Sequence, residues 1–266
     1  MIRMKAPLKT DLNKSSRAPL SKLRMLSTRS KPVVATISFP VRGDVCEPVR
    51  DNTEVIAEVV RTRIPDLLLC AGWSVPTEQS LPAISAASKE AKTVVVVETT
   101  APSPVYFRID NGNVNRMGEQ FFSERVEADE KRLQRLSSAL PDRSFSFRQR
   151  EVVLLNCGEV MVVEGRNDVE FTQNVPRDLR DAVDAPKAII LNPTHTRMGN
   201  CGTVQAWRKH LSRSRRLYIS ASNWDVATGQ MPSATIHSFW HNGEASTATF
   251  EFANESVCYR EWELPK

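Results

Sequence analysis

Runs of apolar residues alternate along the chain with segments whose apolar positions recur every three or four residues. The run "TVVVVETT" (93–100) holds four consecutive valines, which is typical of a strand covered on both faces. The segment "DNTEVIAEVVRTRIPD" (51–66) has helical spacing, with four apolar residues on one face: Val55, Ile56, Val59 and Val60. The alternation predicts one layered α/β domain.

The same alternation continues through the rest of the chain. Further strands are predicted at 31–40, 65–73, 187–195 and 216–224, a strand and a turn at 105–114, and two strands around a polar turn at 144–157. Further helices are predicted at 78–92, 123–140, 176–183 and 203–214. In the predicted helix 123–140, Val126 heads the apolar stripe that should face the core. The segment 233–252 predicts a hairpin around Asn242-Gly243, a favourable pair for a tight turn.

Charge is unevenly distributed along the sequence. Residues 1–31 hold nine basic side chains and one acid, Asp11, for a net charge of +8, whereas residues 32–266 hold 27 basic and 30 acidic residues, a net of −3. We therefore expect a disordered basic tail followed by a single domain over 32–266. A mildly acidic domain argues against a nucleic-acid-binding face, so any such contact would involve the tail.

Cysteine usage and hydropathy bear on the location of the protein. The five cysteines are odd in number and show no C-x-x-C spacing, so neither a disulfide framework nor a zinc site is predicted, and no cofactor is expected. The sequence contains neither a transmembrane run nor a secretory signal. A cytoplasmic location is therefore expected, although a basic, serine-rich tail also has the composition of a mitochondrial transit peptide.

Polar and nucleophilic residues follow several of the predicted strands. They are Cys70, Glu98, Cys157 with Glu159, Asn192 with His195, and Asn223 with Trp224. Because ligands of layered α/β sheets bind outside the carboxyl ends of strands, we expect these residues to share one edge. A thiol and two carboxylates there would suit a thiol-acylation site. Spacing alone favours a structural role for Cys157, because a lone cysteine after an apolar strand is structural more often than catalytic.

Five motifs, in order, resemble the nitrilase or carbon–nitrogen hydrolase superfamily. "PDLLLCAGW" is similar to the family's "DLivlPE" strand, and "VVLLNCGEV" is similar to its nucleophile strand. "AIILNPTHTRMGN", "WRKHLSRSRRLYISASNW" and "SATIHSFWHNGE" then resemble the family's later segments. The resemblance covers roughly 33–250.

The resemblance implies an α-β-β-α sandwich that assembles into homo-oligomers, and a Glu–Lys–Cys triad acting on a small-molecule amide or nitrile. In such a triad the glutamate is the general base, the cysteine attacks the carbon and the lysine stabilises the tetrahedral intermediate. Cys157 and the acid after it, Glu159, match the nucleophile position. A thioester would form there and be hydrolysed by water.

The chain departs from the family at the other two triad positions. Ala71-Gly72 stands in place of Pro-Glu, and no carboxylate follows until Glu78. The lysine register falls on Ser123 or Arg125, and Lys131 lies further inside the predicted helix.

Other residues are candidates for the missing roles. Glu98, at the end of the neighbouring valine strand, is the predicted replacement base. Arg125 is a candidate for stabilising an oxyanion, because a guanidinium keeps its charge and offers several donors. Five residues are predicted to contact substrate: Glu159, Trp73, Asn192, His195 and Trp224. Solvation at the surface or packing in the core is the alternative for each of these residues.

Three functions remain open from the sequence. The favoured one is hydrolysis of an amide or nitrile carbon–nitrogen bond through a Cys157 thioester, because the cysteine and its following acid keep the family's position. The second is a nitrilase-like protein that has lost hydrolysis and serves in binding or assembly. The third is an acyltransferase that passes the thioester to an amine, since hydrolysis and transfer share their first half-reaction.

Overall fold

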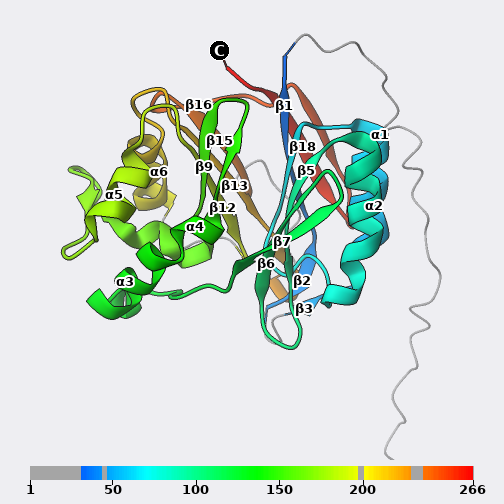
Figure 1. The fold of residues 1–266 in the computed structure, drawn as a ribbon, viewed down its shortest axis with the longest axis horizontal. Coiled ribbons are helices and arrows are strands. Elements are labelled where there is room, and N and C mark those ends of the chain that lie inside the picture. Colours follow the sequence, from blue (N-terminus) through cyan, green and yellow to red (C-terminus); the bar gives the residue numbers. More distant parts are fainter. Residues whose placement is uncertain (1–30, 44–46, 197–200, 229–235, 266) are drawn as a thin grey trace, which may run out of the picture.

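The computed structural model describes residues 31–43, 47–196, 201–228 and 236–265 (Figure 1). Two β-sheets lie face to face, and helices cover the outer face of each one. The predicted α-β-β-α sandwich is therefore confirmed. Residues 1–30, nearly all of the predicted basic tail, lie outside the described residues.

The first sheet has seven strands in the order β17-β18-β1-β4-β5-β6-β7. Their bounds are β1 (Val33–Ser38), β4 (Leu67–Cys70), β5 (Val94–Thr99), β6 (Val105–Asp110), β7 (Asn113–Gly118), β17 (Phe250–Ala253) and β18 (Cys258–Glu263). Strands β1, β4 and β5 run parallel, and the others are antiparallel to their neighbours. All six residues of β5 are buried, as its four valines predict.

The second sheet has six strands in the order β16-β15-β13-β12-β9-β8. Their bounds are β8 (Ser144–Phe147), β9 (Arg150–Leu154), β12 (Ile189–Thr194), β13 (Leu217–Ser222), β15 (His237–His241) and β16 (Glu244–Ala245). Strands β9, β12 and β13 are parallel, so their carboxyl ends meet at one edge. The predicted turn at Asn242-Gly243 joins β15 to β16, and both of its residues have positive φ.

Helices and short strands complete the fold. Helices α1 (Thr53–Arg63) and α2 (Leu81–Ala91) cover the first sheet, and α3 (Glu130–Ser138), α4 (Leu140–Arg143), α5 (Arg177–Asp184) and α6 (Cys201–Leu211) lie on the side of the second (Figure 1). The short strands are β2 (Pro40–Arg42), β3 (Glu47–Pro48), β10 (Val163–Glu164), β11 (Glu170–Phe171) and β14 (Trp224–Asp225). Buried apolar side chains of both sheets, such as Val96 and Leu191, form the core between them.

The helix predicted over 123–140 is wrong in its first part. Residues 125–127 form a single 3₁₀ turn, and α3 begins only at Glu130. The Glu127 carboxylate accepts the N–H of Ser123, which closes the turn locally and competes with a continuous helix. Val126, predicted to be buried, is consequently 85% exposed.

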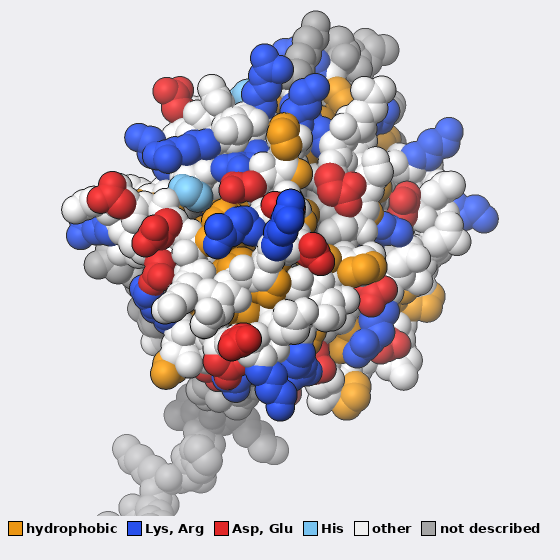
Figure 2. All heavy atoms as spheres, turned by 60° about the vertical axis from the view of Figure 1, so that its left-hand side comes forward, with side chains coloured by type: hydrophobic (Ala, Val, Ile, Leu, Met, Phe, Trp, Pro, Cys, Tyr) orange, Lys and Arg blue, Asp and Glu red, His pale blue; other side chains and the backbone are white. Residues whose placement is uncertain are grey.

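The outer helical face carries mixed charge. Figure 2 shows basic and acidic side chains interspersed over this side of the molecule, with apolar side chains between them. Among the described residues on this face the charges are mixed in sign, whereas a surface that binds a nucleic-acid backbone is predominantly basic. Within the described ranges, no helix combines the length and the apolar character needed to cross a membrane.

A buried imidazole connects the two sheets. His237 on β15 contacts the hydroxyl of Thr36 through Nδ1 and that of Ser38 through Nε2, the latter at 2.7 Å. Burial, with a smaller contribution from Arg260, lowers the pKa of His237 to about 3. The ring is therefore neutral in the folded protein at neutral pH.

This imidazole should make stability depend on pH. Between pH 6.5 and about 3 the unfolded chain binds a proton at His237 that the folded chain does not, so stability is lost as the pH falls. We expect the free energy of unfolding, measured with urea, to fall by up to about 1.4 kcal/mol per pH unit more steeply than in His237→Gln. Equal slopes in the two proteins would contradict this assignment.

Candidate active site

Gly72, in the turn after β4, joins the two sheets at the candidate site. Its N–H donates to the carbonyl of Thr194 at the end of β12, at 3.1 Å, and its carbonyl accepts from Asn223 Nδ2. Asn223 Oδ1 in turn accepts the N–H of Phe39, at 2.9 Å. Strand ends from both sheets are thereby held together at one place.

Cys157 follows β9 in a tight turn, residues 156–159, which we call the cysteine turn. It is partly exposed and has a φ of 31°, a value that non-glycine residues rarely adopt. Asn192 holds this conformation, because its Nδ2 donates to the carbonyls of Leu155 and Cys157 at 2.6 and 3.0 Å. Tyr218 fixes the amide by donating to Asn192 Oδ1 at 2.7 Å. Backbone conformations of this kind persist where the surroundings enforce them, and they concentrate at functional sites.

Gly158 allows a second segment to pack against the cysteine turn. A Cβ at this position would lie 2.3 Å from the carbonyl oxygen of Ser123, a contact that backbone atoms cannot relieve cheaply. Ser123 is one of the two positions in the lysine register, and its hydroxyl donates to Glu127 at 3.0 Å. At the register where the nitrilase family carries its lysine, this chain thus places Ser123 against the cysteine turn.

Glu159 anchors the cysteine turn from inside the protein. Its fully buried carboxylate accepts the N–H groups of Asn156 and Phe121, at 2.8 and 2.7 Å, and forms an ion pair with Arg143. Arg143 is also fully buried and donates to the carbonyl of Glu119. The predicted contact between Glu159 and substrate is not what this geometry favours, because the carboxylate is already engaged within the fold.

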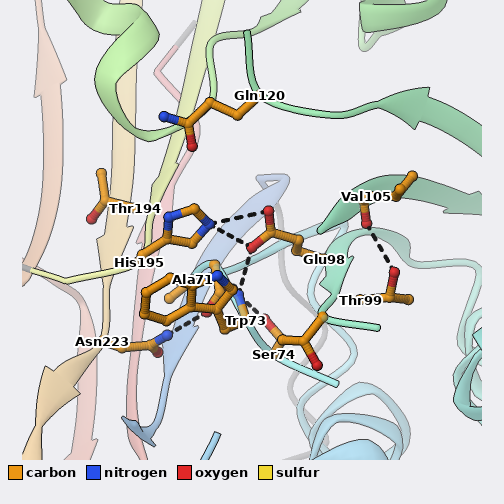
Figure 3. Close-up of polar contacts among 12 residues, drawn as sticks. Ala71, Trp73, Ser74, Glu98, Thr99, Val105, Gln120, Thr194, His195 and Asn223 are labelled. Atoms are coloured by element: carbon orange, nitrogen blue, oxygen red, sulfur yellow. Dashed lines mark hydrogen bonds and ion pairs between the residues drawn. The ribbon is translucent and has the colours of Figure 1, made fainter. Parts of the chain in front are cut away.

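Glu98 lies at the end of β5 and is fully buried. Its Oε2 accepts the N–H of Trp73 at 2.6 Å, and His195 Nε2 lies 2.9 and 3.1 Å from the two carboxylate oxygens (Figure 3). The imidazole of His195 stacks on the indole of Trp73, with ring centroids 4.1 Å apart and planes 7° from parallel. Three residues predicted separately from the sequence therefore form one cluster.

The environment of His195 favours its protonated form. Burial by itself would lower its pKa, but the charges of Glu98 and Cys157 and hydrogen bonds to both raise it to about 10. The ring is therefore an imidazolium at neutral pH, in contact with a buried carboxylate and with the Cys157 thiol. The side chain of His195 keeps 15% of its surface exposed, so the cluster is open to solvent on this side.

The imidazole occupies space that a side chain at position 72 would need. A Cβ on Gly72 would lie 2.3 Å from His195 Cδ2 and 2.9 Å from Glu98 Oε2. The resembling family has its glutamate at this position of the strand motif. Gly72 leaves room for the carboxylate and imidazole that arrive from β5 and β12.

Tyr106 is a site residue that the sequence reasoning missed. It is fully buried on β6, directly opposite Glu98 in the β5–β6 register. Burial, followed by the charges of Glu98, Cys157 and Glu159, raises the pKa of its hydroxyl well above the ordinary value. The only signal in the sequence is its place on the strand after Glu98, which identifies the residue once the hairpin register is known.

Two residues that the sequence predicts for the site make contacts of a different kind in the structure. Arg125 is paired with Glu164, and its side chain is 60% exposed. Trp224 is buried on β14 against Ile236 and Cys258, so core packing accounts for it. Among the described residues, no group of three or more histidine, cysteine and carboxylate side chains is arranged to hold a metal ion.

Comparison with solved structures identifies the fold. The chain is similar to an amidase of the nitrilase superfamily from Nesterenkonia AN1, in a cysteine-to-alanine variant, with a TM-score of 0.56 and 13% identity over 90% of this chain and 94% of that one. A second structure, an amidase from Nesterenkonia sp., matches with a TM-score of 0.53 and 11% identity over 90% and 93%. No protein-family profile matches the sequence, and no curated protein matches it significantly. The nitrilase-type fold predicted by the motifs is confirmed.

A third match concerns the chemistry of that relative. A variant of the same Nesterenkonia amidase carries the acetamide moiety of fluoroacetamide, covalently added at the active-site cysteine. It matches with a TM-score of 0.53 and 11% identity over 90% of this chain and 94% of that chain.

Proposed function

We propose that this chain hydrolyses the carbon–nitrogen bond of a small amide or nitrile through a thioester on Cys157. The single observation that carries the proposal is the cysteine turn. A partly exposed thiol is held at an unusual φ of 31° by Asn192, at the edge where Glu98 and His195 meet. The nitrilase-type fold supports the same interpretation, because the Nesterenkonia amidase of similar fold has an active-site cysteine.

The arrangement supplies what thiol acylation requires. A thiol becomes a nucleophile as the thiolate, so it needs a neighbouring group that takes or stabilises its proton. The cluster beside Cys157 holds a carboxylate and an imidazole. Cys70 and Cys258, by contrast, are buried, and burial raises the pKa of Cys258 to about 11 and that of Cys70 further. These two thiols serve as internal references for an unactivated cysteine.

Selective alkylation tests the proposal. The folded chain is incubated with fluoroacetamide and, separately, with a panel of small aliphatic amides and nitriles, followed by peptide mapping and an assay for released ammonia. We expect the acetamide group on Cys157 and not on Cys70 or Cys258, and ammonia release that is lost in Cys157→Ala. A Ser238→Ala variant on β15 is the control for handling and folding.

The outcomes separate the functions that remain open. Labelling of Cys157 no faster than that of a free thiol, with no ammonia released from the panel, would favour a binding or assembly role. Amide consumption that requires an added amine acceptor would point to acyl transfer. The homo-oligomeric state and the cytoplasmic location stay predictions of the sequence.

A further inference from the structure

We propose that His195 carries the proton in the reaction of Cys157. Glu98 is its positioning residue, and Gly72 leaves the space that the imidazole ring occupies. This inference rests on the proposed function and gives it a mechanism different from a Glu–Lys–Cys triad. It assigns a catalytic role to a histidine that the sequence suggests only as a substrate contact.

The contacts of the ring support this assignment. Nε2 of His195 is held by both oxygens of Glu98, and one face of the ring lies flat against Trp73. The backbone just before it is fixed as well, because the carbonyl of Thr194 accepts the N–H of Gly72. Such a ring is oriented on three sides, as a proton carrier must be to meet its donor in a fixed geometry.

The charged and titratable groups around His195 come from three directions. Glu98 on β5 and the thiol of Cys157 in the cysteine turn act on it directly. Tyr106 on β6 faces Glu98 from the next strand. The carboxylate compensates the imidazolium where partial burial disfavours charge, so the proton can stay on the ring while the sulfur is a thiolate.

The proposed reaction consumes only the amide and water. In the reactive state the proton of Cys157 rests on His195 as part of an imidazolium–thiolate pair, and the thiolate attacks the amide carbon to form a C–S bond. The imidazolium returns its proton to the departing nitrogen as the C–N bond breaks, which leaves a thioester and ammonia. The neutral ring then takes a proton from water, the hydroxide oxygen adds to the thioester, and the C–S bond breaks to release the acid.

Glu98 acts in this sequence through the imidazole. Its carboxylate accepts the N–H of Trp73 as well, so it ties the ring and the stacked indole to one point. A purely structural role for Glu98 would affect stability alone. A positioning role also shifts the pH dependence, because Glu98→Gln removes a charge that raises the pKa of His195 and should move the alkaline limb of kcat/KM to lower pH.

The experiment follows the rate of Cys157 alkylation by iodoacetamide from pH 5 to 10, with the site of labelling mapped. It compares the native chain, His195→Ala, His195→Gln and Glu98→Gln. His241→Gln is the matched control, because His241 pairs with Leu217 at the opposite end of β13. His195→Gln keeps an N–H that can bond to Glu98, so it separates loss of the proton carrier from loss of packing.

We expect fast alkylation in the native chain and the control at pH 7, and at least about tenfold slower alkylation in both His195 variants, which should follow an ordinary thiol with a midpoint near pH 8.5. Native rates in a folded His195→Gln protein would overturn the proposal. Ammonia release that needs Cys157 but survives in His195→Gln would also overturn the role proposed for His195, while the hydrolase proposal would remain supported. Alkylation that depends on His195, without turnover of any amide, would support proton transfer between Cys157 and His195 and would contradict the hydrolase proposal.

Discussion

Glu159→Ala is expected to destabilise the protein by about 3–5 kcal/mol, because it leaves the buried guanidinium of Arg143 without its counter-charge. Two backbone donors, the N–H groups of Asn156 and Phe121, would lose their acceptor at the same time. For a chain of this size the melting temperature should fall by roughly 10 °C. Urea unfolding and thermal melting, each followed by circular dichroism, measure the effect.

A second ion pair provides the matched control. Arg125 and Glu164 also bond to each other, but the arginine is largely solvated, and an exposed pair contributes about 0–1 kcal/mol. Glu164→Ala should therefore unfold close to the native midpoint. If Glu159→Ala and Glu164→Ala were equally mild, the anchoring role of Glu159 in the cysteine turn would have to be abandoned.

Gly72→Ala is expected to lower kcat by about 100-fold or more, the usual range for loss of a general acid or base. The added Cβ would lie 2.3 Å from His195 Cδ2 and 2.9 Å from Glu98 Oε2, so the imidazole has to leave its place against Trp73. The φ of Gly72 is not in the left-handed region, and its two backbone hydrogen bonds use atoms that alanine also has. The loss should therefore appear in kcat more than in folding.

A double-mutant cycle tests whether the loss comes from the displaced ring. Adding His195→Ala to Gly72→Ala removes the clash with the imidazole and leaves only the 2.9 Å approach to the end of the Glu98 carboxylate. The double variant should therefore lose little more activity than His195→Ala alone and should recover most of any lost stability. Strictly additive losses in kcat would mean that Gly72 acts on something other than His195.

The fold could be predicted from the sequence because its signals are local. Four consecutive valines in β5 indicated a strand buried on both faces, and Asn242-Gly243 indicated the turn after β15. The start of α3 could not be predicted in this way. The carboxylate of Glu127 bonds to the backbone before it, and this local bond outweighs the apolar spacing around Val126.

The candidate site depends on contacts that cross between strands and sheets, which the sequence does not reveal. Glu98 and His195 stand 97 residues apart, and only the docking of both sheets brings the imidazole onto the carboxylate. In the sequence, Gly72 stands where the nitrilase family has a glutamate. In the structure, this glycine leaves room for the side chains of Glu98 and His195. The partner of Arg125 and the packing of Trp224 are likewise decided by tertiary neighbours.

The position of β18 has a consequence for synthesis of the protein. This strand lies between β17 and β1, although residues 258–263 follow every residue of the candidate site in the sequence. On the ribosome, β1 therefore keeps an unpaired edge until these late residues emerge. Cys157 and His195 follow strands β9 and β12 of the second sheet, and Glu98 lies on β5 of the first. The proposed proton transfer requires both sheets, so we expect the Cys157 thiol of a nascent chain to react like an ordinary thiol until the two sheets have docked.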